Sequence, residues 1–159
     1  MNEGVEWALH SCVNLTWMDD GQAVTAARLA AFYRLPTAYL NKQLQALARA
    51  GILTSTSGPR GGFRLARRPE DITLMDVVTA IEGPEEAFRC EEILRQGPGD
   101  HEGVDYRESC VISQAMRRAD LAWRRELAGQ TVADIKATVE RRAPSAPGDT
   151  RNWFANLRT

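Results

Sequence analysis

The chain begins with apolar residues spaced three and four apart, which is the pattern of one face of an α-helix. The positions on this face are Val5, Leu9, Cys12, Val13 and Thr16. The pattern predicts a first helix that ends near residues 19–21. Because Cys12 belongs to the apolar face, we expect its side chain to pack in the core.

Two more helices are predicted on either side of a break at Leu35-Pro36. Thr25 is a suitable cap for a helix over residues 26–33. Pro36 suits the first turn of a further helix over residues 37–50. The inward positions of that helix, spaced i, i+4 and i+7, are Leu40, Leu44 and Leu47.

Residues 52–55 and 63–66 are two short runs typical of strands, and a turn over residues 57–62 that is rich in Gly and Pro joins them. Two helices followed by such a hairpin give the order of a winged helix-turn-helix. The sequence therefore predicts a mainly α-helical fold with a two-stranded wing.

Helical patterns resume after the hairpin. They predict a helix over residues 71–82, with Thr73 as its cap and Asp76 three residues later, and a last helix over residues 131–142. Between them, residues 110–129 predict a long amphipathic helix. Its apolar seam consists of Ile112, Ala115, Ala119, Ala122, Trp123 and Leu127. We expect this seam to pair with a second copy of the chain, because a protein that reads a palindromic DNA site needs a two-fold partner.

The remaining segments are irregular. Residues 85–109 form an acidic loop that contains glycines, and the tail after Ala143 has little pattern, although Trp153 and Phe154 could dock it. Long loops in compact domains are usually functional or disordered. We divide the chain into a winged-helix unit (1–83), a loop (84–109), dimerisation helices (110–142) and a C-terminal tail (143–159).

Charge is segregated along the chain, although 20 Lys and Arg nearly balance 21 Asp and Glu. Residues 21–69 contain eight basic and no acidic residues, whereas residues 70–110 contain three basic and twelve acidic residues. A basic segment of this kind attracts phosphate. A solvated basic face is the simpler alternative, but it does not explain the missing acids. We therefore interpret the winged helix as a binder of double-stranded DNA.

The predicted DNA contacts lie on the helix-turn-helix and on the wing. Residues near the start of a recognition helix reach phosphates and base edges in the major groove. At the tip of the hairpin, Arg60 would reach phosphate or a minor groove. The predicted contact residues are Arg28, Thr37, Ala38, Tyr39, Lys42, Gln43, Pro59, Arg60 and Gly61.

Other classes of protein fit less well. No apolar run approaches the roughly 20 residues of a membrane span, and the N-terminus lacks a signal-peptide pattern, so we expect a cytoplasmic protein without a membrane partner. Three cysteines in a reducing compartment are poor material for structural disulfides. No nucleophile elbow or phosphate loop is visible, and we do not expect an enzyme.

The segment from Ser57 to Arg67, followed by residues 69–74 and 77–83, resembles the signature of the IscR/NsrR-type bacterial regulators. The resemblance extends to about Arg142. It implies a homodimeric winged-helix repressor whose long helices pair the subunits. It also implies a sensor of iron–sulfur status, nitric oxide or redox state that holds a cluster beyond the wing.

The cysteines depart from the family's usual pattern of three closely spaced ligands, because only Cys90 and Cys110 flank the loop. A three-cysteine site is therefore excluded, and some members of the family lack a cluster. However, residues 6–10 resemble the N-terminal helix of the RsrR type, in which a Glu and a His complete a [2Fe–2S] site with two cysteines. The resemblance implies Glu6, His10, Cys90 and Cys110 as ligands. Trp7, which follows Glu6 in the sequence, would shield these ligands from water or respond to their charge.

The residues themselves leave alternatives open. Glu6 and His10 lie about 40° apart on a helix and can approach one iron, but the same spacing describes an ordinary surface pair. Two cysteines, a histidine and a glutamate also form an acceptable zinc site. A reversible disulfide between the two cysteines is a third possibility, without any metal.

Overall fold

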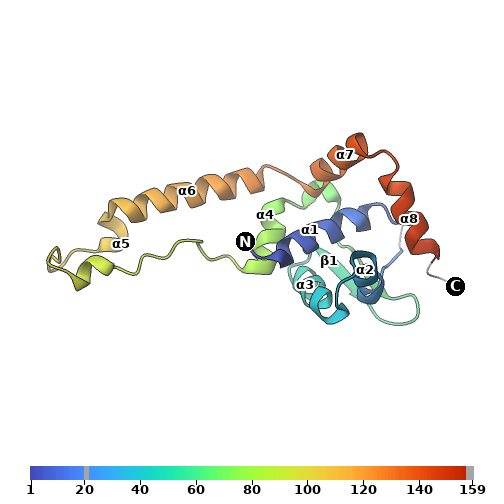
Figure 1. The fold of residues 1–159 in the computed structure, drawn as a ribbon, viewed down its shortest axis with the longest axis horizontal. Coiled ribbons are helices and arrows are strands. Elements are labelled where there is room, and N and C mark those ends of the chain that lie inside the picture. The colour runs from blue at the N-terminus through green and yellow to red at the C-terminus, as the bar shows by residue number, and fades with distance from the viewer. Residues whose placement is uncertain (20–21, 157–159) are drawn as a thin grey trace.

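The structure is a computed structural model that describes residues 1–19 and 22–156. Figure 1 shows a helical body from which a long arm projects. The α-helices of the body are α1 (Glu3–Thr16), α2 (Ala26–Tyr33), α3 (Thr37–Arg49), α4 (Leu74–Glu82), α7 (Val132–Arg142) and α8 (Ala146–Asn156). The wing consists of β1 (Leu53–Thr56) and β2 (Gly62–Leu65), and a short 3-10 helix, η1 (Pro69–Asp71), precedes α4. The arm contains η2 (Ile93–Gln96), α5 (Tyr106–Ser109) and α6 (Val111–Ala128).

The predicted fold, mainly helical with a two-stranded wing, is confirmed. The α2 helix spans the predicted residues, and the Arg28 backbone N–H donates to Thr25 Oγ1 at 3.2 Å. At the start of α4, the backbone N–H of Asp76 donates to Thr73 and that of Thr73 donates to Asp76, both at 3.0 Å. The α1 helix ends at Thr16, earlier than predicted, and residues 20–21 of the predicted end lie outside the described residues.

The core forms where α1 packs against α3, α4 and α7. The inward leucines of α3 are fully buried, and so is Cys12 on α1. The expectation that Cys12 packs in the core is therefore confirmed. Burial raises the pKa of its thiol to about 12, which makes it a poor candidate for a thiolate ligand.

The wing is an antiparallel hairpin in which Leu53 pairs with Leu65 and Ser55 with Phe63. Its base is joined to the segment before α2. The Val24 N–H donates to the Phe63 carbonyl at 2.9 Å, and the Phe63 N–H donates to the Val24 carbonyl at 2.8 Å. These bonds fix the wing relative to the helix-turn-helix.

The arm is formed by α6 and by the loop that lies against it (Figure 1). With 18 residues, α6 is about 27 Å long. Asp120 on α6 accepts from the Ala87 N–H of the loop at 3.4 Å and from Arg124 Nε at 2.7 Å. After α6 the chain returns to the body, where the Leu74 N–H donates to the Gln130 carbonyl at 2.9 Å.

The tail is where prediction and structure differ most. Residues 146–156 form a helix, α8, although its two nearby prolines and mixed polar sequence gave no helical pattern. A proline is tolerated in the first turn of a helix, and Pro147 lies there. Docking through Trp153 and Phe154 is confirmed, since Phe154 is fully buried and Trp153 packs against the core.

The predicted division into dimerisation helices (110–142) and a tail (143–159) does not correspond to separately packed units, because parts of both segments pack in the core of the body. Val132 of α7 and Phe154 of α8 belong to the same hydrophobic core as α1 and α3. The segment that projects from the body is the loop with α5 and α6 (Figure 1). In the described part of the chain, no helix combines the length and apolar character that crossing a lipid bilayer requires.

A substitution at Gly62 tests the close approach of the wing to the segment before α2. Its φ is +135°, and an added Cβ would lie 2.5 Å from the Val24 carbonyl carbon. We expect Gly62→Ala to lower the free energy of unfolding by about 2–4 kcal/mol, because it adds a steric clash to backbone strain. Urea unfolding measures this decrease.

Gly58→Ala is the matched control, because Gly58 has a φ of +98° but, apart from its chain neighbours, no described atom lies within 4 Å of the added Cβ. It adds only backbone strain, about 1–2 kcal/mol. Equal decreases in the two variants would contradict the close approach between Gly62 and Val24.

Candidate nucleic-acid interface and cysteine pocket

The start of α3 presents short side chains and a cation to solvent. Thr37, Ala38 and Lys42 are exposed, and Tyr39 is partly exposed. The turn before α3 is tight, because Arg34 ends α2 with a φ of 56° and Pro36 is the N-cap of α3. This arrangement fits a recognition helix whose N-terminal residues reach base edges.

The expectation for Gln43 is wrong in the described conformation. Its side chain is 8% exposed and lies against α1. A Cβ added to Gly4 would be 2.8 Å from Gln43 Cδ, so the absence of a side chain at Gly4 admits the glutamine. Gln43 lies three residues after Leu40 and four before Leu47, so the three share one face of α3, and α1 packs against this helix.

Arg28 also differs from the expectation. Its guanidinium carbon lies 5.7 Å from the centre of the Phe154 ring on α8. The side chain is therefore directed towards the C-terminal helix and not outwards to a DNA backbone. The sequence could not indicate this contact, because it gave no sign of α8.

At the tip of the wing, Pro59 and Arg60 are exposed, whereas Gly61 is buried within its own turn. The Gly61 N–H donates to the Gly58 carbonyl at 2.9 Å. Gly61 therefore shapes the turn that presents Arg60, and it offers no exposed surface of its own.

Five basic residues of the acid-free segment are exposed, and the described residues form no ion pair with any of them. They are Arg34, Lys42, Arg49, Arg60 and Arg64. By contrast, Arg67 and Arg68 pair with Asp76 at 3.6 Å and Asp71 at 3.2 Å at the start of α4. The positive charge of the winged helix is therefore concentrated on α3 and the wing, where phosphate would be bound.

The two candidate cysteine ligands come together on the arm. Cys90 lies on the loop and Cys110 is the N-cap of α6, and both line one apolar pocket of about 260 Å³. Both are free thiols and partly buried. The apolar side chains around them are Phe88, Ile93, Leu94, Tyr106 and Ile112. The loop is held here by Tyr106, whose Oη accepts from the His101 N–H at 2.7 Å and donates to the Gly99 carbonyl at 3.0 Å.

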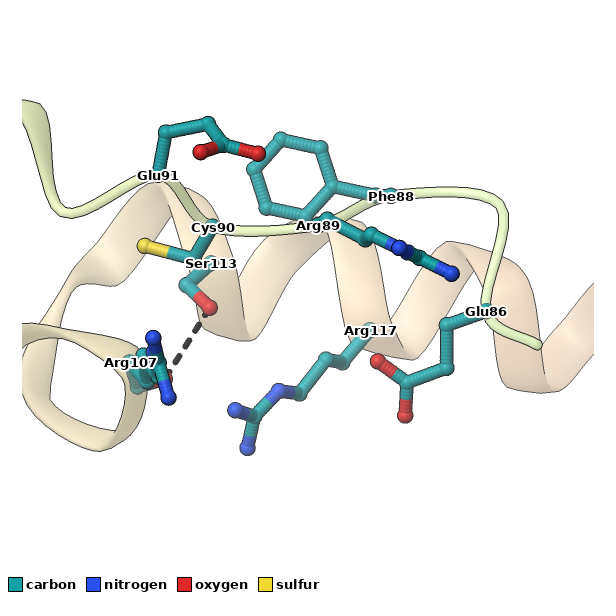
Figure 2. Close-up of a pocket in the computed structure, with 8 residues that line it drawn as sticks. All are labelled: Glu86, Phe88, Arg89, Cys90, Glu91, Arg107, Ser113 and Arg117. Carbon is teal, nitrogen blue, oxygen red and sulfur yellow. Dashed lines mark hydrogen bonds between the residues drawn. The ribbon is translucent and has the colours of Figure 1, made fainter.

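Cys90 also lines a second pocket of about 290 Å³ that is rich in arginine (Figure 2). Ser113 of α6 is buried there, and its Oγ donates to the Arg107 carbonyl at 3.0 Å. The guanidinium of Arg107 pairs with Glu92 at 3.3 Å, and that of Arg117 pairs with Glu108 at 3.3 Å. Cys90 thus lies between an apolar pocket and a charged one.

Glu6 and His10 form an exposed pair on α1, and their Oε1 and Nε2 atoms are 4.0 Å apart. Their side chains are 70% and 61% exposed. Trp7 is half-buried beside them, with its ring 5.3 Å from that of Tyr33 on α2. This pair lies on the body, whereas Cys110 lies at the far end of the arm (Figure 1). Within the described residues of one chain, no three His, Cys, Asp or Glu side chains are close enough to share a metal ion.

Tyr33 is a residue of this region that the sequence did not indicate. Asn14 Nδ2 donates to Tyr33 Oη at 2.8 Å, and burial raises the pKa of the phenol. Its ring contacts those of Trp7, His10 and Phe32. The adjacent aromatic residues at the end of α2 were the available signal, but only packing against α1 gives Tyr33 its place next to His10.

Residues 1–138 match the Rrf2 family, which is described as an iron-dependent transcriptional regulator. The chain belongs to this family. It is therefore a DNA-binding transcriptional regulator and not an enzyme, as predicted. The suspected likeness to IscR-type regulators is confirmed at the level of the family.

One relative agrees with this assignment, and two solved structures share the fold. YwgB of Bacillus subtilis (strain 168) is 31% identical over 124 residues, which cover 77% of this chain and 75% of that protein. T. potens IscR has a similar fold, with a TM-score of 0.65, 20% identity and coverage of 90% of both chains. CymR, the global cysteine regulator of B. subtilis, has a TM-score of 0.61 and 18% identity, with 87% of this chain and 96% of that chain covered.

The interface predicts a role for Arg60 at the wing tip. We expect Arg60→Ala to weaken DNA binding and to reduce the slope of log K against log salt by about 0.9 for each phosphate that the arginine neutralises. Arg49→Ala removes one positive charge at the C-terminal end of α3, away from the wing tip, and should change the affinity and the slope less. Fluorescence anisotropy at several salt concentrations measures both variants. An equal change in slope for the two would contradict the role of the wing tip.

Proposed function

We propose that the protein is a dimeric redox-responsive repressor whose affinity for its operator is controlled by a [2Fe–2S] cluster. Cys90, Cys110, Glu6 and His10 would be the ligands. One observation carries the proposal: two cysteines from separate segments line one pocket, while a Glu–His pair is exposed on the helix that packs against the recognition helix.

The donor atoms fit such a cluster. Thiolates are the usual ligands of iron–sulfur clusters, and histidine can replace cysteine on one iron. The apolar pocket would shield Cys90 and Cys110 from water, which stabilises a site that holds iron and sulfide. The buried thiol of Cys12 cannot substitute for either of them.

The four ligands can meet only between two protomers, because α1 lies apart from α5 and the start of α6 in one chain (Figure 1), and Cys110 is the N-cap of α6. A dimer would also cover the apolar face of α6, where Ile112 is 67% and Met116 is 41% exposed. Beside Met116 lies a hollow of about 420 Å³, lined also by Met1, Phe88 and Trp123, which a second copy can fill. Exposed apolar surface of this kind is typical of an interaction site.

The packing of α1 offers a route from the ligands to DNA. When bound, a [2Fe–2S] cluster could accept one electron from a cellular reductant, which would add a negative charge next to its ligands. Glu6 lies two residues from Gly4, which contacts Gln43 of the recognition helix, so a shift of α1 would move α3. Trp7 gives a second contact, to Tyr33 of α2. A local change of charge would thereby alter the geometry of the DNA-binding helices.

The ligand set is tested by variants of the full-length protein purified without oxygen. We expect Cys90→Ala to lose iron, sulfide and visible absorption, whereas Cys12→Ala retains them. Glu6→Ala and His10→Ala should leave the cluster labile or spectrally altered, and Glu3→Ala, which removes an exposed carboxylate from the same helix, should not.

Wild-type absorption and redox behaviour in both Glu6→Ala and His10→Ala would contradict the mixed ligand set. A colourless protein that contains zinc would favour the zinc-stabilised regulator. A protein without metal that forms a reversible Cys90–Cys110 disulfide would favour the thiol switch.

Dimerisation is tested on α6. We expect Met116→Glu to shift the protein towards monomer, because it places a charge on the apolar face. Leu121→Glu is the control, since Leu121 is exposed but lies about 140° away around the helix. Sedimentation velocity separates the two forms. An unaffected dimer in Met116→Glu, or dissociation in both variants, would relocate the interface.

A further inference from the structure

The C-terminal helix α8 lies outside the residues that match the family, yet it packs directly on the helix-turn-helix. Phe154 is fully buried and stacks on Phe32 of α2, with ring centres 5.3 Å apart and planes 15° apart. The Trp153 ring meets the Phe32 ring edge-on, with ring centres 4.9 Å apart. Two aromatic side chains of α8 thus cover one side of α2.

Arg28 lies under this cover. It is the third residue of α2, and its guanidinium lies over the Phe154 ring at 5.7 Å, a cation–π arrangement. The first helix of a helix-turn-helix crosses the DNA backbone. A basic residue near the start of that helix is therefore well placed for phosphate, but α8 holds the charge of Arg28 against an aromatic face.

We propose that α8 is an autoinhibitory strap on the helix-turn-helix. While α8 is docked, Arg28 is held on Phe154 and is withheld from DNA. When α8 moves away, Arg28 becomes an additional phosphate contact in each protomer. This proposal goes beyond cluster-controlled binding, since it needs only the DNA-binding fold and would hold in a protein without a cluster.

The attachment of α8 is suited to local release. On α8, Arg151 and Asn152 are exposed and Trp153 is partly buried, whereas Thr150 and Phe154 are buried. One polar contact joins α8 to the end of α1, from Arg151 Nη1 to the Trp17 carbonyl at 3.5 Å. A helix that packs on the edge of a domain, with part of its surface exposed, can open at a lower free energy than the whole domain.

A purely structural role for α8 predicts the opposite result. If α8 only held α2 in position, loosening it would weaken DNA binding. If α8 withholds Arg28, loosening it strengthens binding and steepens its dependence on salt, because another cation then meets phosphate. The direction of the change therefore distinguishes the two roles.

The experiment uses full-length protein and a duplex DNA of mixed sequence, whose binding depends on phosphate contacts. We expect Phe154→Ala and Trp153→Ala to bind more tightly at low salt. The slope of log K against log salt should steepen by about 0.9 for each arginine released. Asn152→Ala, on the exposed side of α8, is the matched control and should keep the wild-type slope.

Adding Arg28→Ala to Phe154→Ala should remove the extra slope, because it deletes the released cation. If the double variant keeps the steeper salt dependence, the proposal is wrong. The proposal is also wrong if Phe154→Ala and Trp153→Ala both bind DNA more weakly with the wild-type salt dependence. Circular dichroism checks that each variant is folded. If Phe154→Ala is not folded, Trp153→Ala replaces it, because this change removes only a partly exposed ring. The same comparison is then made between Trp153→Ala and the double variant Trp153→Ala/Arg28→Ala.

Discussion

The close packing of α1 on α3 is the contact on which the rest of the structure depends. Gly4 allows the Gln43 side chain to lie directly against α1, so the first helix and the recognition helix cannot move independently. The inner face of α1 carries Cys12 into the core, and its outer face carries Glu6 and His10. One helix therefore joins a candidate ligand pair to the element that reads DNA.

Unlike α1, which is packed closely in the body, the arm projects from the body of its own chain (Figure 1). The apolar face of α6 is exposed. The start of α6, where Cys110 lines the cysteine pocket, lies far from α1 (Figure 1). Both features have the same explanation in a dimer, in which a second protomer covers the apolar face and supplies the remaining ligands. Assembly and the chemistry of the site would then be inseparable.

Local patterns in the sequence predicted local structure well. Thr25 and Thr73 mark helix starts because their hydroxyls accept backbone N–H groups, and the leucines of α3 mark its buried face. Gln43 was misplaced because a polar side chain suggests solvent, whereas the gap at Gly4, about forty residues earlier in sequence, decides its position. Arg28 was misplaced for a similar reason. Its partner Phe154 lies in a helix without a readable pattern.

The candidate site was predictable only in its separate halves. The spacing of Glu6 and His10 on one helix places them together, as the structure has them. The resemblance implied Cys90 and Cys110 as ligands of one site, and the structure adds that both line one pocket. The apolar seam of residues 110–129 predicts pairing with a second copy, but it does not indicate which subunit supplies each ligand. The relation between the halves therefore depends on the assembly.

A mixed dimer tests that relation most directly. One protomer would carry Cys90→Ala and its partner both Glu6→Ala and His10→Ala, each with a different affinity tag so that only the mixed dimer is purified. If the ligands come from two subunits, one of the two sites retains all four of its ligands. The account then predicts the wild-type absorption spectrum with half of the iron of the wild-type dimer. Absence of the wild-type spectrum from a folded mixed dimer would contradict a site shared between subunits.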